Sequence, residues 1–260
     1  MKLSVQEFGS EYFETLNQSW DLYCEPIHYN QTAHRKAVIF IPKQVGKPLR
    51  EVTDIGMWVS GGIDSAMTTY LLCKMIKDNN LPVTFHPFSS RRGRPWNPMY
   101  AMDVTDFIRG ELDLSYQQMA EHVVYYPDES LGSDYIEIDI FTEKDTLHFK
   151  ENIVQIMYSG VTANPPIDDK TISRNKERTR DDEEIKKLFW ESETRSFINC
   201  FSNTNKKIMK TLYDKFNLID NLFPITRSCE GSDYETGNYT YPCEKCWWCE
   251  ERNWAFGRYG

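Results

Sequence analysis

The feature that most constrains the fold is a glycine-rich loop, Ser60-Gly61-Gly62-Ile63-Asp64-Ser65, which joins an apolar strand to a helix. Residues 55–59 before it have the composition of a buried strand, and residues 66–78 after it keep apolar side chains at helical spacing. A loop that ends at a helix N-terminus offers free N–H groups and a favourable dipole to an anion. The two glycines let the backbone turn its amides toward that anion, because no Cβ lies in the way. The loop therefore predicts a site for a pyrophosphate group.

The side chains of this loop suit a nucleotide and a metal ion. Ser60 and Ser65 add hydroxyl donors, and Asp64 has the chemistry to hold Mg²⁺ or a ribose or amine group. The loop has neither the Gly-Lys-Ser/Thr ending of the common phosphate loop nor the three spaced glycines of the dinucleotide motif. A chance Gly-Gly turn capped by serine is the alternative. We predict that ATP contacts Ser60, Gly61, Gly62, Ile63, Asp64 and Ser65.

A group of cysteines far along the chain predicts a metal site. Its members form a C-x13-C-x2-C-x2-C array of Cys229, Cys243, Cys246 and Cys249. Four thiolates at this spacing suit tetrahedral Zn²⁺, since a C-x2-C turn aims two sulfurs at one point. An iron–sulfur cluster and unligated buried thiols are the alternatives. Four protein ligands leave no open position on a zinc ion, so we assign it to stability rather than chemistry.

Several motifs resemble one enzyme family. The glycine-rich loop is similar to the SGGxDS loop of the ATP pyrophosphatase (PP-loop) superfamily, whose members cleave ATP between the α and β phosphates and transfer an adenylate. Residues 205–210 and the run Thr226-Arg227-Ser228-Cys229 resemble the lysine-bearing helix and the Thr-x-Ser-Cys element of 7-cyano-7-deazaguanine synthases. Residues 157–164 resemble the strand and the Gly-Val-Asn-Ala turn that these enzymes place beside their substrate.

The resemblance implies an ATP-dependent ligase with ATP and Mg²⁺ as cofactors and structural Zn²⁺. It implies that 7-carboxy-7-deazaguanine or a related carboxylate is adenylated, that ammonia displaces AMP to give an amide, and that a second round dehydrates the amide to a nitrile. Catalytic roles fall to Asp64, Ser65 and Lys206, although Lys207 fits the family lysine to within one residue. The implied substrate-binding residues are Gly160, Thr162 and Asn164.

The resemblance breaks directly after Asn164. The family has an Asp-Tyr-Ser-Gly-Tyr-Pro-Asp-Cys-Arg run there, whereas this chain has Pro165-Pro166-Ile167-Asp168-Asp169-Lys170. Two prolines remove two backbone donors where the family presents polar groups to its substrate. We therefore expect adenylation chemistry with a changed acceptor. Lys170 and Arg174 are candidates for a new carboxylate clamp, and a solvated loop is the alternative.

A second loop is expected at the same edge of the sheet, since ligands of such sheets lie beyond the carboxyl ends of the strands. It runs from Phe88 to Arg94, and its arginines beside Trp96 suit phosphates and a stacked purine. An exposed basic loop is equally favoured for Arg91, Arg92 and Arg94. We include Phe88 and Arg91 among the predicted ATP-binding residues.

Two other functions use the same motifs. A tRNA sulfur-transferase of this superfamily would have the loop together with cysteines that carry a cluster or a persulfide. A non-catalytic nucleotide-binding interaction protein would keep the fold without turnover. NAD⁺ synthetases share the loop, but the four-cysteine array is foreign to them. The net charge of −9 argues against a broad nucleic-acid surface.

Composition and element order indicate an α/β fold. Strands that alternate with helices predict a Rossmann-like parallel sheet with helices on both faces. We expect an N-terminal appendage (1–50), a PP-loop ATP pyrophosphatase domain (51–220) and a small zinc-binding lobe (221–260). The chain has no apolar run of membrane-spanning length and no secretory core at its start, and seven cysteines fit a reducing cytoplasm. The sequence does not determine the oligomeric state, and a homodimer is one of the alternatives.

Overall fold

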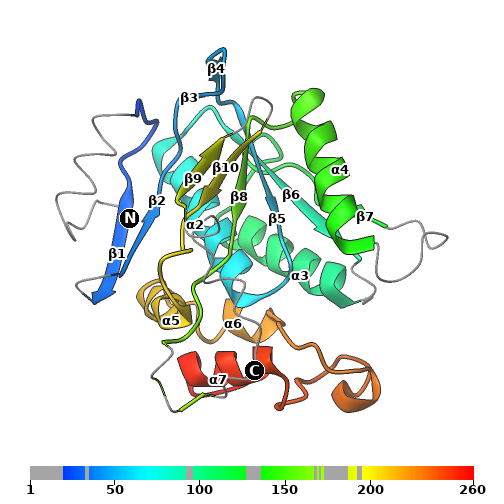
Figure 1. The fold of residues 1–260 in the computed structure, drawn as a ribbon. Helices are drawn as coiled ribbons and strands as arrows, with labels where there is room; N and C mark the ends of the chain where they lie inside the picture. Colours follow the sequence, from blue (N-terminus) through cyan, green and yellow to red (C-terminus); the bar gives the residue numbers. More distant parts are fainter. Residues whose placement is uncertain are drawn as a thin grey trace.

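A six-stranded sheet forms the centre of the molecule (Figure 1). The computed structural model describes residues 20–32, 35–91, 96–126, 136–166, 169, 171–172, 187–191 and 195–260. The sheet has the order β7-β6-β5-β8-β10-β9, and all neighbours are parallel except β9, which runs antiparallel to β10. Its strands are β5 (Asp54–Trp58), β6 (Thr84–Ser90), β7 (Val123–Tyr125), β8 (Ile156–Ser159), β9 (Phe189–Glu191) and β10 (Ser196–Asn199).

Helices cover both faces of this sheet. Figure 1 draws α4 in front of the strands and α2 and α3 behind them, with α5, α6 and α7 beyond one edge. The bounds are α2 (Ile63–Asn79), α3 (Trp96–Glu111), α4 (Ile136–Lys150), α5 (Lys206–Lys215), α6 (Leu222–Ile225) and α7 (Trp247–Phe256). Two small antiparallel pairs precede the sheet, β1 (Ile27–Thr32) with β2 (Arg35–Ile39) and β3 (Gln44–Val45) with β4 (Arg50–Glu51).

The alternation of side chains along β5 divides the core into two clusters. Ile55 and Met57 face the larger cluster, which contains the apolar residues of α2, α3 and α5. Gly56 faces the smaller cluster, where a Cβ would meet Met157 and Phe88 at less than 3.0 Å. The smaller cluster lies between the sheet and α4. A glycine is required at position 56 because the side chains of this cluster leave no room for a Cβ.

Helix α2 is enclosed on almost all sides. Twelve of its seventeen residues are buried, because the sheet lies on one side and α3 and α5 pack on the other. The helix ends at Asn80, whose left-handed backbone lets its N–H group bond back to the carbonyl groups of the last turn. This burial fixes the position of the N-terminus of α2, where the glycine-rich loop ends.

The strand order reverses between β5 and β8. From β5 the chain moves outward through β6 to β7, and it then returns to the other side of β5 to add β8 and β10. In open α/β sheets such a reversal leaves a crevice beyond the carboxyl ends of the two strands, and ligands bind there. The segments that follow β5 and β8 are the glycine-rich loop and residues 160–164.

The predicted core elements are confirmed with shifted ends. Helix α4 begins at Ile136 and ends at Lys150, because Asn152 takes a left-handed conformation that stops it. The strands β1, β9 and β10 were not predicted. Residues of the expected N-terminal appendage, from Ala37 to Ile41, lie in the larger core cluster. The division at 50 and 220 stays a prediction.

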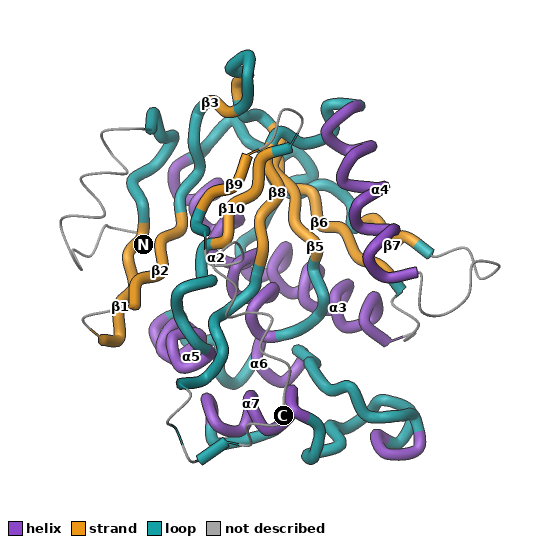
Figure 2. The backbone as a smooth tube through the Cα atoms, viewed as in Figure 1, coloured by secondary structure: helices purple, strands orange, loops and turns teal. Residues whose placement is uncertain are grey.

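The segment between α6 and α7 is mostly loop, as Figure 2 shows, with one short helical turn at Tyr234–Thr236. No helix among the described residues is both long and apolar enough to cross a membrane.

Candidate functional site

The glycine-rich loop presents an uncapped helix N-terminus. Gly62 is the N-cap of α2 and supplies no side-chain cap, so the first-turn N–H groups point away from the helix without an intrahelical carbonyl. Gly61 has φ +75°, and a Cβ there would lie 2.8 Å from the backbone nitrogen of Ala101. The glycines therefore serve both the left-handed turn and the close approach of α3.

The two serines of the loop bond to each other. The hydroxyl groups of Ser60 and Ser65 lie 3.0 Å apart, and Ser65 Oγ donates to the carbonyl of Gly62 at 3.1 Å. The backbone N–H of Ser60 donates to Ser65 Oγ at 3.2 Å. Ser65 is thus buried inside the loop and holds its shape, whereas Ser60 is exposed.

The turn after β8 packs directly on this loop. A Cβ on Gly160 would lie 2.8 Å from the backbone nitrogen of Ser65 and 2.9 Å from its Cα. Thr162 donates from Oγ1 to Oδ2 of Asp64 at 3.3 Å. Two of the three predicted substrate-binding residues therefore contact the predicted phosphate loop across the strand-order reversal.

Lys206 completes this group from the first turn of α5. Its Nζ lies 3.1 Å from Asp64 Oδ2 and 2.6 Å from Glu251 Oε2, and only 2 % of its side chain is exposed. The helix begins at this position because the Asn205 side chain accepts the N–H of Lys207 and caps it. A buried lysine between two carboxylates is an electrostatic centre, since each charge needs the others to offset its desolvation.

Lys207 has a different environment from that of Lys206. Its side chain is half exposed, and its Nζ lies 3.9 Å from Asp169 Oδ2 and 4.4 Å from the centre of the Trp254 ring. Helical geometry separates neighbouring residues by about 100° around the axis, so only one of the two lysines faces the loop. The structure places Lys206 there.

Of the other predicted site residues, Phe88, Arg91 and Asn164 lie in the described part of the chain. Phe88 is buried in the smaller core cluster and stacks on His148 at 4.1 Å between ring centres. Arg91 follows β6, and its backbone N–H donates to Tyr125. Asn164 is 4 % exposed. Arg92, Arg94, Asp168, Lys170 and Arg174 lie outside the described residues.

A contact that the sequence did not predict joins the loop to the segment before Cys229. The N–H of Arg227 donates to the carbonyl of Gly61 at 2.7 Å, and a Cβ on Gly62 would lie 2.9 Å from Ser228 Oγ. The Arg227 guanidinium lies over the Tyr100 ring at 5.1 Å. The available signals were the position of Arg227 and Ser228 directly before a cysteine of the array and the resemblance of residues 226–229 to the Thr-x-Ser-Cys element.

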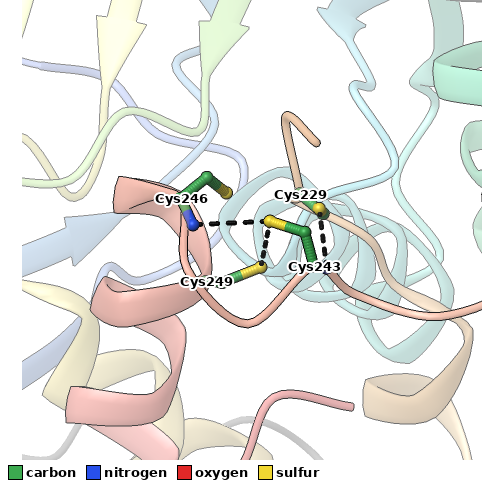
Figure 3. A group of neighbouring side chains, drawn as sticks. All are labelled: Cys229, Cys243, Cys246 and Cys249. Atoms are coloured by element: carbon green, nitrogen blue, oxygen red, sulfur yellow. Dashed lines mark hydrogen bonds between the residues drawn. The ribbon is translucent and has the colours of Figure 1, made fainter. Parts of the chain in front are cut away.

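The four cysteines converge at the N-terminal end of α7 (Figure 3). Their sulfur atoms all lie within 4.8 Å of one another, and Cys246 is the N-cap residue of the helix. Thiolates bound to one tetrahedral ion at about 2.3 Å would lie about 3.8 Å apart. The observed cluster is therefore of the size that a single ion requires.

Backbone N–H groups donate to these sulfur atoms. Cys229 Sγ accepts from Gly231 and Cys243 at 3.2 Å, and Cys246 Sγ accepts from Glu230 at 3.4 Å. Such bonds favour thiolates, the form that binds a metal ion.

The segment that departs from the family pattern is attached to α7. Asp169 accepts the indole N–H of Trp254 at 2.8 Å, and bonds from Thr171 lower the pKa of Asp169 to about 2. Asp169, in the described part of this segment, therefore contacts α5 through Lys207 and α7 through Trp254.

Comparison with protein-family models and with curated proteins finds no match. Among solved structures, the fold is similar to that of the U34-tRNA thiolase NcsA from Methanococcus maripaludis with its 4Fe-4S cluster. The two chains are 13% identical, the match covers 79% of this chain and 70% of that chain, and the TM-score is 0.44. At this level of similarity the match identifies neither a family nor a reaction for this chain.

Proposed function

We propose that this protein is an ATP-dependent ligase that adenylates a carboxylate and then adds ammonia. The observation that carries the proposal is the convergence of Asp64, Lys206 and Thr162 on an uncapped helix N-terminus at the reversal of strand order. Helix N-termini bind phosphates, and a lysine fixed at the same point offsets charge that develops on a leaving pyrophosphate.

In this proposal the first-turn N–H groups of α2 bind the β and γ phosphates of ATP. A carboxylate oxygen of the acceptor attacks the α phosphorus, the bond to the bridging oxygen breaks, and pyrophosphate leaves with its charge offset by Lys206. Ammonia then attacks the acyl carbon, AMP leaves, and an amide forms. The protein contributes alignment and charge stabilisation, so no nucleophilic side chain is required.

Asp64 is the residue that would hold Mg²⁺ beside the phosphates, since it is a half-buried carboxylate at the mouth of the loop. The four cysteines would hold a single Zn²⁺ with no open position, which supplies stability to the lobe and no step of the reaction. The compact sulfur cluster supports one ion, because thiolates on four separate irons of a cluster would stand further apart than those on one ion.

The proposed acceptor is 7-carboxy-7-deazaguanine or a related carboxylate, as the motif resemblance implies. A second round that converts the amide to a nitrile belongs to the same proposal. Residues 165–170 differ from the family in composition, and their two prolines offer no backbone donors, so acceptor preference is where we expect the chain to differ.

The test is identification of the products of ATP. Purified protein is incubated with Mg-ATP, ammonia and either 7-carboxy-7-deazaguanine or a panel of carboxylates, and the nucleotides are separated by chromatography. The proposal expects AMP and pyrophosphate in proportion to the amide or nitrile formed. Formation of ADP and orthophosphate contradicts it, and transfer of sulfur to tRNA in a parallel reaction that contains tRNA and a sulfur donor would support the sulfur-transferase instead.

A further inference from the structure

We propose that Glu251 positions Lys206 in the nucleotide site, and that the four-cysteine site controls nucleotide binding through this contact. Metal and nucleotide would then bind cooperatively, each strengthening the other. This inference rests on the proposed nucleotide site, and it adds a regulatory role to cysteines that otherwise only stabilise a lobe.

The first link runs through α7. Glu251 has no exposed surface, and its Oε2 lies 2.6 Å from Lys206 Nζ. It stands two residues after Cys249 in the same helix, and α7 packs on α5 next to Lys206. A displacement of α7 therefore moves the carboxylate that holds the lysine 3.1 Å from Asp64.

The second link reaches the loop itself. Arg227, which donates its N–H to Gly61, stands two residues before Cys229. Arg252, next to Glu251, donates to the carbonyls of Thr226 and Phe223 at 3.0 and 2.8 Å. Glu251 and Arg227, which contact Lys206 and Gly61, thus each stand two residues from a cysteine. Arg252 joins α7 to the segment before Cys229.

A bound metal ion would fix α7 and the segment before Cys229 relative to each other. Helix α7 has ten residues, which is too short to be stable alone in water. The segment that leads to it is mostly loop, as Figure 2 shows, and the backbone hydrogen bonds within residues 232–241 are local turns. One ion bound by Cys229, Cys243, Cys246 and Cys249 would cross-link the segment that contains Arg227 to the helix that contains Glu251.

Glu251 acts in this scheme as a positioning residue and touches no reacting atom. Without it, Lys206 would have a single carboxylate partner and several rotamers to choose from. Energetic coupling between two sites is reciprocal, so a nucleotide that bonds to Lys206 and the loop must also slow loss of the metal.

The experiment measures metal release and nucleotide binding on the full-length, metal-loaded protein. Zinc transfer to a chromogenic chelator is followed with and without the α,β-methylene analogue of ATP and Mg²⁺. We expect the nucleotide to slow release at least fivefold, and removal of the metal to weaken nucleotide binding by a similar factor. In Glu251→Ala the effect on release should fall to what the Arg227 contact alone carries, and in Glu251→Gln, which keeps a hydrogen-bond acceptor, it should partly return.

Glu250→Ala is the matched control, because Glu250 is the neighbouring carboxylate on α7. It should retain the full effect of nucleotide on metal release. Equal release rates with and without bound nucleotide overturn the inference while leaving the proposed function intact. No binding of the nucleotide to the metal-loaded protein contradicts the proposed function, and the inference falls with it.

Discussion

At the scale of single residues, the site depends on side chains that are absent as much as on those that are present. Gly160 and Gly62 each lie against another segment so closely that a Cβ would meet atoms at 2.9 Å or less. The two approaches bring the turn after β8 and the Ser228 hydroxyl to the glycine-rich loop. Sequence motifs selected these glycines, but only the structure shows which segment each one admits.

We predict that Gly160→Ala lowers ATP turnover by about 100-fold, because the new Cβ would displace the Ser65 backbone, and misplacement by about 1 Å costs that much in rate. The matched control is Gly110→Ala in α3, where a Cβ meets nothing within 4 Å. The control should keep full turnover and gain up to about 1 kcal/mol of unfolding free energy. Steady-state assays and urea unfolding of both variants provide the check, and full turnover in Gly160→Ala would contradict it.

A second residue-scale prediction separates the two neighbouring lysines. Lys206→Met should lower turnover about 10²–10³-fold. It should also lower the unfolding free energy by about 3–5 kcal/mol, because the fully buried Glu251 carboxylate loses the ammonium group that lies 2.6 Å from it. Lys207→Met, whose lysine is half exposed, should change neither quantity appreciably.

The double variant Lys206→Met/Glu251→Gln distinguishes folding from catalysis. Removing both charges should recover most of the lost stability, whereas turnover should stay low because the cation is still missing. Recovery of turnover in the double variant would show that Lys206 serves only the fold.

At the scale of elements, the alternation of strands and helices predicted the layers. It did not predict where each helix and strand ends, which depends on single residues such as the left-handed Asn152 after α4. The loop and α2 follow from composition and periodicity, which act over a few residues, whereas the Lys206 helix was predicted from its resemblance to the family's lysine-bearing helix. Two contacts join segments that are far apart in the sequence. Lys206 and Glu251 are 45 positions apart, and Arg227 and Gly61 are 166 positions apart. No local pattern encodes such pairs, so they were not predicted.

An element-scale prediction concerns the packing of β6 against α3. His122 contacts Ser89 of β6 at 2.5 Å and Thr105 of α3 at 2.9 Å, and burial lowers its pKa from 6.5 to about 4. Because the folded pKa is below the unfolded one, the stability that neutral His122 contributes is present above pH 6.5 and is lost as the pH falls toward 4.

The size of this effect follows from the same pKa values. Between pH 7 and pH 5, His122 alone should cost the protein about 2 kcal/mol of unfolding free energy. The variant His122→Gln, which cannot titrate, should lose about that much less than the wild type over the same interval. Urea unfolding at the two pH values measures the difference, and identical pH slopes would contradict the assignment.

At the scale of the whole molecule, the four-cysteine region is joined to Lys206 through α7 and to the glycine-rich loop through the segment before Cys229. A metal site was predicted from the cysteine spacing, and the convergence of the four sulfurs agrees with that prediction. The contact of the four-cysteine region with Lys206 was outside the reach of the sequence, because it depends on how α7 packs on α5.

We predict that Cys246→Ser loses its metal and that the lobe unfolds locally, because binding free energy at such sites is largely folding free energy. Limited proteolysis should then cleave between α6 and α7, while Cys73→Ser, at a buried cysteine of α2 outside the cluster, should retain the metal. Metal analysis should find one zinc per chain without visible absorption. A brown protein with several irons per chain would contradict the single-ion site.

The most direct test of the central claim is calorimetric binding of the Mg²⁺ complex of α,β-methylene-ATP. The claim is that the loop from Ser60 to Ser65, at the reversal of strand order, is the nucleotide site. The wild type and Gly110→Ala should bind with equal dissociation constants between about 1 µM and 1 mM, and Gly160→Ala should bind at least tenfold more weakly. Absence of binding by the wild type, or equal binding by Gly160→Ala, would contradict the account.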